Sequence, residues 1–534
     1  VTAFPREEPL LFRDLTWALD SRIFGFRNQR GFHFVNVVLH ACVVALCFAS
    51  LLRITRRYFV ALFAAVCFLA LAVHVEPVAW IMGRKDLLAA RFRFLALLAH
   101  SCALDAKAGA PRVAWYGASL VAMTLALFSK ISALAYPAML FLLALFQPAL
   151  RGDEPAGGRF PWARIPGALA GILPHLVVVL LVFRWYHGVL SEFGLLDRGY
   201  TATPAQHVVN LLIFNPLAWL KYAQILLAPG DVVLFHAWPA NAAIMEPRYM
   251  AVAAAAWLVL AVLAVVLLAR RRALAFYFLT FFALMVPHMN IQYIGIWVAN
   301  RYLYFAAFCV TAAAVTLAAD VWCRGRRPAA WAAAAAMVLF VAVNGWCQAR
   351  SLPFWRSAET MWPREMARAD AVPDVYYNLA AFYYTTDIRT PDPAERENWL
   401  RKTEEVVARA QERFPLPAGT PPVSQQNLLL LHALTAIVRA EPAERRLAAL
   451  QAVESVAPRN DAVLWQLTQF YYKEALQMPD GARRAEAARQ ALAYYARYHS
   501  AVHHDAGFAA MDRGVRAEFR SDFPFLAEDL EKLE

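Results

Sequence analysis

Charged side chains are scarce in this chain. Only 17% of its 534 residues are Asp, Glu, Lys or Arg, whereas 60% are hydrophobic and the mean hydropathy is +0.42. This balance excludes an ordinary water-soluble protein, because so much apolar surface must face lipid. The net charge of +12 could indicate nucleic-acid binding, but many arginines form short clusters between apolar runs. Such clusters are typical of the cytoplasmic loops of membrane proteins, so we expect no nucleic-acid partner.

Cysteine is sparse as well, and none of the seven cysteines lies in residues 351–534. No CxxC pair and no Cys/His ligand spacing occurs, so the sequence supports neither a disulfide framework nor a zinc site. The need for a divalent metal stays open. The chain begins with Val1, and residues 1–30 lack the apolar core of a signal peptide. We expect the natural chain to begin earlier, with a further membrane span before Val1.

Long apolar runs fill most of residues 34–347. A helix needs about 17–25 apolar residues to cross a bilayer, and this length predicts ten crossings in an all-α membrane domain. The arginine clusters then lie on the cytoplasmic side. We interpret a further apolar stretch, 208–228, as an interfacial or re-entrant helix, because a crossing there would place the arginines at 270–272 outside. The expected crossings are 34–54, 58–74, 87–104, 113–128, 131–147, 165–185, 248–269, 274–289, 303–322 and 329–347.

Residues 351–534 are charged and follow a helical period. Two similar passages, 373–384 and 458–472, each place small and aromatic residues on one helix face after a turn that contains proline. Paired helices of this kind are typical of tetratricopeptide repeats, with an insertion near 415–422. An unrelated helical bundle is the alternative. We predict an outer-face loop at 1–33, a membrane domain at 34–350 and a soluble helical-repeat domain at 351–534.

Five ionisable residues follow the second apolar run within a short distance. They are His74, Glu76, Arg84, Lys85 and Asp86. Ionisable groups next to hydrocarbon are costly unless they face a protein-lined site that water can reach. The cluster therefore predicts the rim of an active site in a membrane enzyme, on the face opposite the arginine clusters.

Six passages, in order along the chain, together resemble one known family. They are FRDLTW (12–17), GFHFVNVVLH (31–40), HVEPVAWIMGRKDLL (74–88), SK (129–130), PGDVVLFH (229–236) and NRYLY (300–304). With the repeat-like helices after them, they are similar to bacterial relatives of the transmembrane and tetratricopeptide-repeat O-mannosyltransferases. The resemblance implies a GT-C glycosyltransferase fold in a bacterial inner membrane, with the repeat domain on the outer, periplasmic face.

The resemblance also implies a reaction. A sugar, for which the family suggests mannose, would pass from a polyprenyl-phosphate donor in the membrane to a protein or glycan acceptor, and the repeat domain would bind the acceptor or another partner protein. No cofactor besides this lipid-linked donor is implied. The phosphate needs cations and the acceptor hydroxyl needs a carboxylate as base. The candidate catalytic residues are Glu76, Asp86 and Asp14, the candidate phosphate ligands are Arg13, Arg84, Lys85, Lys130 and Arg301, and His33, His74 and Tyr302 complete the site.

Each candidate also has a structural explanation. Arg13 and Lys85 can extend toward lipid headgroups, Asp86 can cap the helix that it begins, and Tyr302 fits an aromatic belt at the membrane interface. Glu76 is the hardest to explain as structure, so it is the main catalytic candidate.

The chain departs from the family pattern at several positions. Asp14 stands where the family has proline, Asn300 where it usually has an acidic residue, and Ile131 where Glu or Pro would follow Ser-Lys. The acidic residue thought to be the family's base lies upstream of the first motif, where this chain has only Glu7 and Glu8. A catalytically inactive scaffold, whose repeat domain binds a partner, is therefore the alternative hypothesis. A transporter is disfavoured because we expect no broken helix pair among the spans.

Overall fold

The structure is a computed structural model that describes residues 10–26, 28–154, 160–192, 204–230, 232–236, 245–289, 296–325, 327–387, 389–417, 421–479, 481–502 and 506–532. Within these ranges the regular structure is helical and no strand occurs, which confirms the all-α prediction for them. The chain divides into two compact units, one that reaches to Arg356 and one that begins at Ser357. The predicted boundary lay at 350. Glu7, Glu8 and Asp231 lie outside the described residues.

The first unit holds the long apolar helices. Its elements are α1 (Leu11–Phe24), α2 (Gln29–Thr55), α3 (Tyr58–Ala70), η1 (Ala72–His74), α4 (Val75–Ala79), η2 (Ile81–Gly83), α5 (Arg84–Asp105), α6 (Ala110–Ser129), η3 (Ile131–Ala135), α7 (Tyr136–Arg151), η4 (Trp162–Arg164), α8 (Ile165–Glu192), α9 (Pro204–Val209), η5 (Asn210–Phe214), α10 (Asn215–Leu227), α12 (Pro247–Arg270), α13 (Arg272–Met285), η6 (Val286–His288), α14 (Asn300–Cys323), α15 (Arg327–Ser351) and η7 (Leu352–Arg356).

Eight helical segments among the described residues are long and apolar enough to cross a membrane, and a ninth is a bent pair. Each of the ten expected crossings overlaps one of these segments or the shorter apolar helix Arg272–His288. Helices of this length could span the hydrocarbon of a bilayer, as an integral membrane protein requires. The stretch 208–228, which we expected not to cross, is not among the candidate spans. It forms the end of α9, the π-helical turn η5 and α10.

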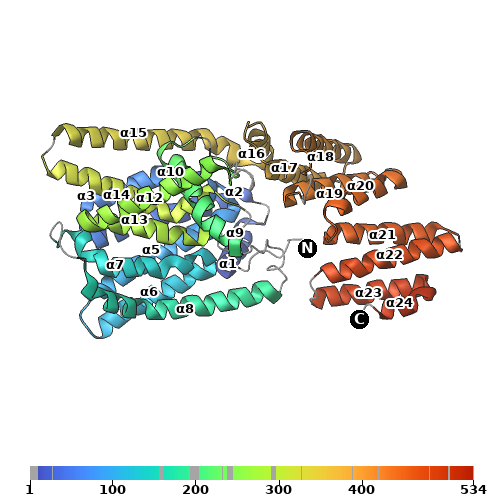
Figure 1. The fold of residues 1–534 in the computed structure, drawn as a ribbon, viewed down its shortest axis with the longest axis horizontal. Coiled ribbons are helices and arrows are strands. Elements are labelled where there is room, and N and C mark those ends of the chain that lie inside the picture. The colour runs from blue at the N-terminus through green and yellow to red at the C-terminus, as the bar shows by residue number, and fades with distance from the viewer. Residues whose placement is uncertain are drawn as a thin grey trace. The chain divides into compact units, whose positions relative to one another are not determined.

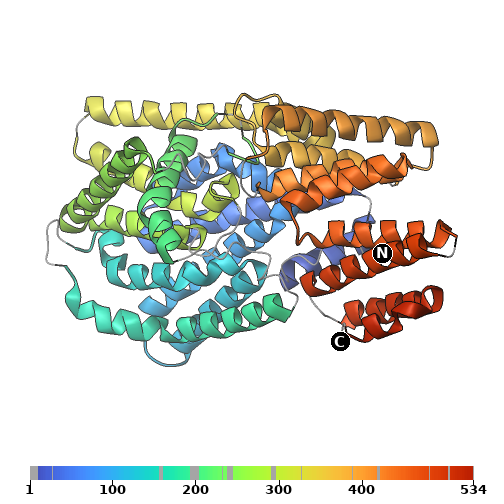
Figure 2. The same ribbon diagram turned by 45° about the vertical axis from the view of Figure 1, so that its right-hand side comes forward.

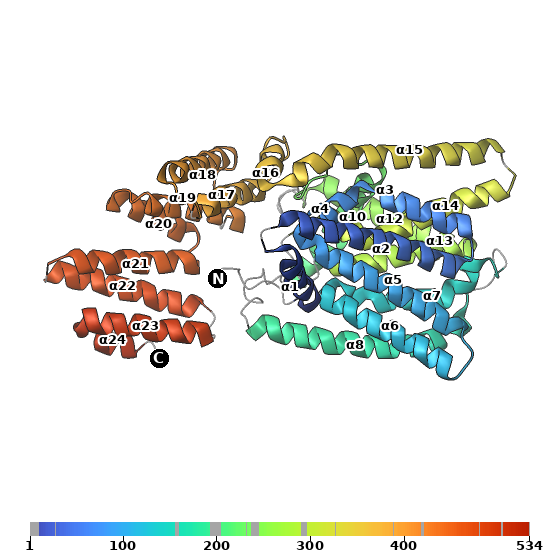
Figure 3. The same ribbon diagram turned by 180° about the vertical axis from the view of Figure 1, so that it is seen from behind.

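Inner and outer helices differ sharply in burial. The spans that contain α5, α7 and α14 are mostly buried within the unit, whereas those of α8, α12 and α15 are mostly exposed. Figures 1 and 3 place α8 and α15 at opposite edges of the unit. Their exposed residues include large apolar ones, such as Leu180 on α8 and Val338 on α15. Apolar surface of this extent is not stable against water, so these helices suit contact with lipid.

The second expected crossing is broken rather than straight. Tyr58–Ala70 and Ala72–Ala79 meet at an angle of 58°, and the expectation of unbroken spans is wrong here. A straight helix could not run on through this segment, because Pro77 has no N–H to donate to the Val73 carbonyl and its ring would clash with that carbonyl. The break itself falls at Leu71, whose backbone is extended. The chain therefore stops running along the bundle at Leu71 and continues in the short helix α4.

Residues 1–33 were expected to form a loop, but Leu11–Phe24 form the helix α1. The helix forms because apolar residues recur at every fourth position, which places them on one face of a helix. Leu11, Leu15, Leu19 and Ile23 are each more than half exposed, whereas Asp20 is buried. An exposed apolar stripe of this kind is typical of a helix that lies in the membrane interface.

The second unit consists of consecutive helix pairs, as Figure 2 shows. α17 packs on α18, α19 on α20, and α21 on α22. One apolar core joins α19, α20 and α21, and a second joins α21 to the helices after it. The elements are α16 (Ala358–Met366), α17 (Pro373–Asp387), α18 (Pro393–Arg413), α19 (Val423–Val438), α20 (Ala443–Val456), α21 (Asp461–Gln477), α22 (Ala482–Ala501), α23 (Ala506–Asp522), η8 (Pro524–Leu526) and α24 (Ala527–Glu531).

The two similar sequence passages occupy equivalent places in this unit. Residues 373–384 lie in α17 and residues 458–472 run into α21, and each of these is the first helix of a pair. The proline-rich stretch 415–422 connects α18 to α19, and its residues 418–420 lie outside the described part of the chain.

Candidate functional site

The charged motif at 74–88 folds back on itself between α3 and α5. Glu76 lies on α4, and Arg84 and Asp86 lie in the first turn of α5. Gly83 permits the close return, because a Cβ at this position would lie 2.6 Å from the Cα of Pro77. All three charged side chains are buried. The fold therefore sets these charges at one end of the long helices.

A small polar cavity lies at this end of the unit. Four of the predicted site residues, Asp86, Lys130, Arg301 and Tyr302, line it. Arg93, which the sequence analysis did not single out, lines it as well. These side chains come from α5, from the junction of α6 and η3, and from the start of α14. The cavity thus combines one carboxylate with three cations.

Asp86 carries the carboxylate of this cavity and is 5% exposed. One of its oxygens, Oδ1, forms an ion pair with the ammonium of Lys130. The other, Oδ2, is buried and has no hydrogen-bond partner among the described residues. Asp86 was also a candidate helix cap, but Gly83 takes the N-cap position and no side chain caps α5. A buried carboxylate oxygen without a hydrogen-bond donor is costly, so Oδ2 is well placed to accept a proton or a hydrogen bond.

Glu76 is fully buried and bound to Arg301. Its Oε1 pairs with the Arg301 guanidinium, and its Oε2 accepts a hydrogen bond of 3.2 Å from the Arg301 backbone N–H. That N–H belongs to the first turn of α14, where helices leave donors unsatisfied. The guanidinium also lies over the rings of Trp80 and Tyr302, at 5.4 and 5.1 Å from the ring centroids. Glu76 therefore fixes the position of Arg301 at the cavity.

Arg84 belongs to a separate buried network and does not line the cavity. It forms an ion pair with Asp20 of α1, and it donates to Asn36 Oδ1 at 2.9 Å and to the Phe32 carbonyl at 2.8 Å. The Asn36 amide in turn donates to the carbonyls of residues 78 and 80. These bonds tie α1 and α2 to the motif. Arg84, a predicted phosphate ligand, thus lies away from the cavity.

The remaining charged candidates lie outside the cavity lining. Arg13 pairs with its neighbour Asp14 at 2.8 Å, and its guanidinium lies 4.7 Å from the centre of the Trp17 ring. The Asp14 side chain is 51% exposed. Lys85 follows Arg84 in α5, and its charge acts on Lys130.

The predicted histidines take different positions. His33 lies on α2, half-buried, where it feels the charge of Arg84. His74 is buried among aromatic rings, with centroids 5.2 Å from His40 and 4.8 Å from Tyr304. The Tyr304 hydroxyl is hydrogen-bonded to His40 Nδ1 at 2.8 Å. His74 is thus one ring away from the cavity, since Tyr304 lines it.

Three residues that the sequence analysis missed complete the cavity. Arg93 donates to the Ser132 hydroxyl at 3.1 Å, and His288 stacks on the ring of Tyr302 with centroids 4.2 Å apart. A signal for Arg93 was present, because it lies seven residues after Asp86 and so on the same face of α5. Ser132 and His288 offered no such signal.

Asn300 stands where an acidic residue was expected. Its amide donates to the Val233 carbonyl at 2.8 Å, and its oxygen bonds His236 Nε2 at 3.1 Å. Asn300 therefore anchors the segment after α10 to the start of α14. This role needs an amide that can both donate and accept, which a carboxylate could not provide.

The cavity is narrow in this structure. Its space is about 10 Å³, which is room for roughly one water molecule. A sugar phosphate could enter only if side chains at the cavity moved apart. The Lys130–Asp86 ion pair and the Arg93–Ser132 hydrogen bond each join two residues that line the space.

Comparisons with protein-family models, with curated proteins and with solved structures find no match for this chain. Among the described residues, no group of three or more His, Cys, Asp or Glu side chains could hold a metal ion.

Proposed function

We propose that this protein is a membrane glycosyltransferase of the GT-C type that uses a polyprenyl-phosphate sugar. The observation that carries the proposal is the buried cavity in which Asp86, with one oxygen free of hydrogen bonds, lies among Lys130, Arg93 and Arg301. A carboxylate among cations at the end of apolar helices is the combination that transfer from a lipid-linked phosphate requires.

In this proposal Asp86 is the catalytic base. The acceptor hydroxyl oxygen attacks the anomeric carbon of the sugar, and Asp86 Oδ2 takes the hydroxyl proton. The bond between the anomeric carbon and the phosphate oxygen breaks, and its electron pair leaves with the polyprenyl phosphate. Lys130, Arg93 and Arg301 stabilise the charge that develops on this phosphate.

Glu76 has a different role in this proposal from the one that its sequence context suggested. Both of its oxygens are engaged by Arg301, so it has no free oxygen to take a proton. We assign it as a positioning residue that orients the Arg301 guanidinium toward the donor phosphate.

Donor binding must open the cavity, and the ion pair between Lys130 and Asp86 suggests how. An arriving phosphate competes with the carboxylate for the Lys130 ammonium, because a charge-assisted contact to phosphate is at least as strong. Lys130 then moves to the phosphate, and Asp86 becomes free to accept a proton. The same event admits the donor and activates the base.

The charge distribution supports an outer-face site. The long helices carry the cavity at one set of ends and the arginine clusters at the other, and the positive-inside rule assigns the arginines to the cytoplasm.

We further propose that the second unit is a tetratricopeptide-like domain on the outer face that presents the acceptor protein.

The test is transfer of radiolabelled sugar from a polyprenyl-phosphate donor to membrane proteins, at equal expression of each variant. We expect Asp86→Asn to keep the fold and to lower transfer by about 10²-fold or more, the scale for losing a positioned base. Asp370→Asn, an exposed change in the second unit, should transfer like the wild type. Equal transfer by Asp86→Asn would remove Asp86 from the mechanism.

The narrowness of the cavity favours one alternative. If the Lys130–Asp86 and Arg301–Glu76 pairs serve only to join helices, the protein is an inactive scaffold and the second unit carries the function. Absence of transfer by the wild type, with donor and acceptor shown to be present, would support the scaffold.

A further inference from the structure

A second polar pocket lies at the opposite ends of the long helices. α3 begins beside it, α7 and α12 end there, α13 begins there and α14 runs to its rim. It has a volume of about 440 Å³. On α14, Arg301 of the candidate site and Asp320 of this pocket are 19 residues apart, which is about 29 Å at 1.5 Å per residue. The arginine pocket is therefore separated from the candidate site by roughly the thickness of a bilayer.

Positive charge exceeds negative charge in this arginine pocket. Glu154 and Asp320 are its carboxylates, against five arginines. Asp320 pairs with two of them, at 3.3 and 3.5 Å, and Glu154 pairs with one at 3.0 Å. The five arginines are Arg57, Arg151, Arg270, Arg271 and Arg272.

Two of these arginines are largely buried and held in place by carboxylates. The Arg151 side chain is 7% exposed and is held by Asp105 at 2.7 Å, and the Arg272 side chain is 10% exposed. Arg270, by contrast, has no ion pair in the part of the chain that the structure describes. The pocket therefore combines fixed cations with one cation that is open to a ligand.

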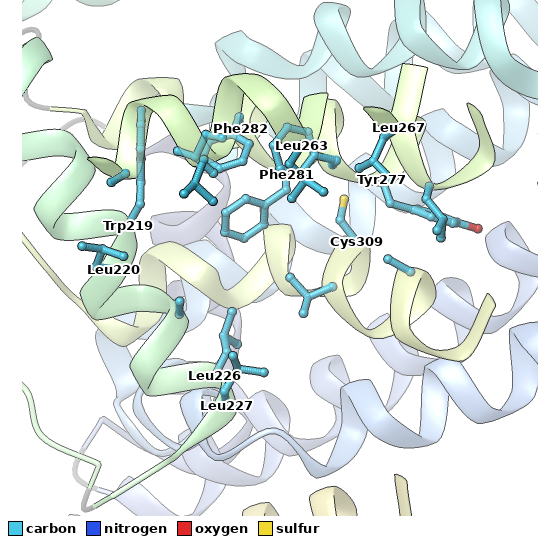
Figure 4. Close-up of a pocket in the computed structure, with 18 of the residues that line it drawn as sticks. Trp219, Leu220, Leu226, Leu227, Leu263, Leu267, Tyr277, Phe281, Phe282 and Cys309 are labelled. Carbon is cyan, nitrogen blue, oxygen red and sulfur yellow. The ribbon is translucent and has the colours of Figure 1, made fainter. Parts of the chain in front are cut away.

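An apolar groove adjoins the arginine pocket. It has a volume of about 720 Å³ and is lined by side chains of α10, α12, α13 and α14. Figure 4 shows Trp219 and Leu220 at one end of the labelled side chains and Leu267 and Tyr277 at the other. Leu274 lines both the groove and the arginine pocket. The two spaces therefore adjoin at the first turn of α13.

We propose that the arginine pocket and the groove together bind an anionic phospholipid, with its phosphate among the arginines and an acyl chain in the groove. Basic pockets between membrane helices on the cytoplasmic side suit anionic headgroups. The surplus positive charge favours a lipid with net negative charge over a zwitterionic one. A free phosphate ion would leave the apolar groove empty, so the two adjoining spaces favour a ligand with both a charged and an apolar part.

The test uses the full chain, purified in a neutral detergent, and measures its melting temperature during titration with dioleoylphosphatidylglycerol. Dioleoylphosphatidylcholine and inorganic phosphate are the comparison ligands. We expect the anionic lipid alone to raise the melting temperature in a saturable way, because a ligand that binds only the folded state stabilises it. Equal effects of the two lipids, or an equal effect of inorganic phosphate, would overturn the proposal.

Two variants address the two halves of the site. Arg270→Gln removes a cation that has no ion pair with any described residue, and the half-saturating lipid concentration should rise about fivefold, as expected for roughly 1 kcal/mol per arginine. Ala314→Trp fills the groove from an exposed position on α14 and should weaken binding as well. Arg248→Gln, near the other end of α12 and paired with Glu246, is the matched control and should bind like the wild type.

The outcomes separate this proposal from the proposed enzyme. Loss of lipid stabilisation in Arg270→Gln and Ala314→Trp, but not in Arg248→Gln, supports the lipid site whether or not the protein transfers sugar. Unchanged stabilisation in both variants would overturn it. If Ala314→Trp lowers sugar transfer and leaves phosphatidylglycerol binding unchanged, the groove holds the donor instead and the lipid site is wrong.

Discussion

The most deeply buried ion pairs among the described residues lie in the first unit. In the first unit, the side chains of the Arg84–Asp20 pair are 0% and 5% exposed, and those of Arg301–Glu76 are 9% and 0% exposed. In the second unit, Arg401–Glu405 is 58% and 49% exposed. Water already solvates the exposed pair, whereas the buried pairs exist only because each charge compensates the other. A buried pair is therefore a poor source of stability, but it is very sensitive to the loss of one partner.

The largest effect that we predict is for Arg84→Met. The change leaves the Asp20 carboxylate buried without its cation and should cost about 3–5 kcal/mol, seen as a lowered melting temperature of the purified full chain. Arg489→Met, at an exposed position of α22, is the control and should change the melting temperature little. The double variant Asp20→Asn/Arg84→Met should recover part of the loss. A melting temperature like that of the wild type for Arg84→Met would contradict the role of this pair.

The next effect concerns Glu76→Gln. Glutamine keeps the shape of the side chain but not its charge, so the Arg301 guanidinium is less well fixed and the donor should bind more weakly. We expect the KM for the polyprenyl-phosphate donor to rise about tenfold, which is about 1.4 kcal/mol, with a smaller change in kcat. A fall in kcat of about 10²-fold at unchanged KM would instead make Glu76 the base and remove Asp86 from that role.

A smaller effect depends on pH and lies in the second unit. Burial alone would raise the pKa of Asp512, but hydrogen bonds from Arg516 and Tyr495, at 2.8 and 2.5 Å, lower it below its usual value. Because the folded-state pKa is lowered, the stabilisation is present above about pH 4 and is lost as the pH falls through the folded pKa. Asp512→Asn should therefore lower the melting temperature at pH 7, and the difference from the wild type should shrink below pH 4. A difference that is independent of pH would contradict this account.

The smallest effect belongs to the exposed pair. Arg401→Gln removes an i,i+4 contact with Glu405 on α18 and should cost about 0.3–0.5 kcal/mol, a shift that salt should reduce further. A loss of stability as large as that of Arg84→Met would contradict the view that an exposed ion pair contributes less than a buried one loses on removal of one partner.

The sequence predicts the helices far better than it predicts the contacts between charges. Apolar runs of about 20 residues can only become helices in lipid, because every backbone group must be satisfied within the segment. The break at 71–83 follows instead from local chemistry, from Pro77 and from a close approach that only Gly83 permits. The apolar character of the segment alone does not predict this break.

The candidate site could be predicted only in part. The motif at 74–88 indicated where charges gather, and Asp86 does meet Lys130 and Arg301 at one cavity. The partner of Arg84 is Asp20, 64 residues away on a helix that we took for a loop. Which cation pairs with which carboxylate is decided by the packing of α1, α2 and α14, and no spacing along the chain encodes it.

The bent helix pair also has a consequence for how the protein is made. α3 has 13 residues and spans only about 20 Å, so it is too short to cross the membrane alone. It is held by α14, through the Arg57–Asp320 pair at one end and the contact of Phe68 with Tyr304 at the other. α14 is synthesised about 230 residues after α3 ends, which at 5–20 residues per second is roughly 10–50 s later. During this interval α3 has α2 as a neighbour but lacks α14, so we expect it to stay beside α2 until α14 has been synthesised.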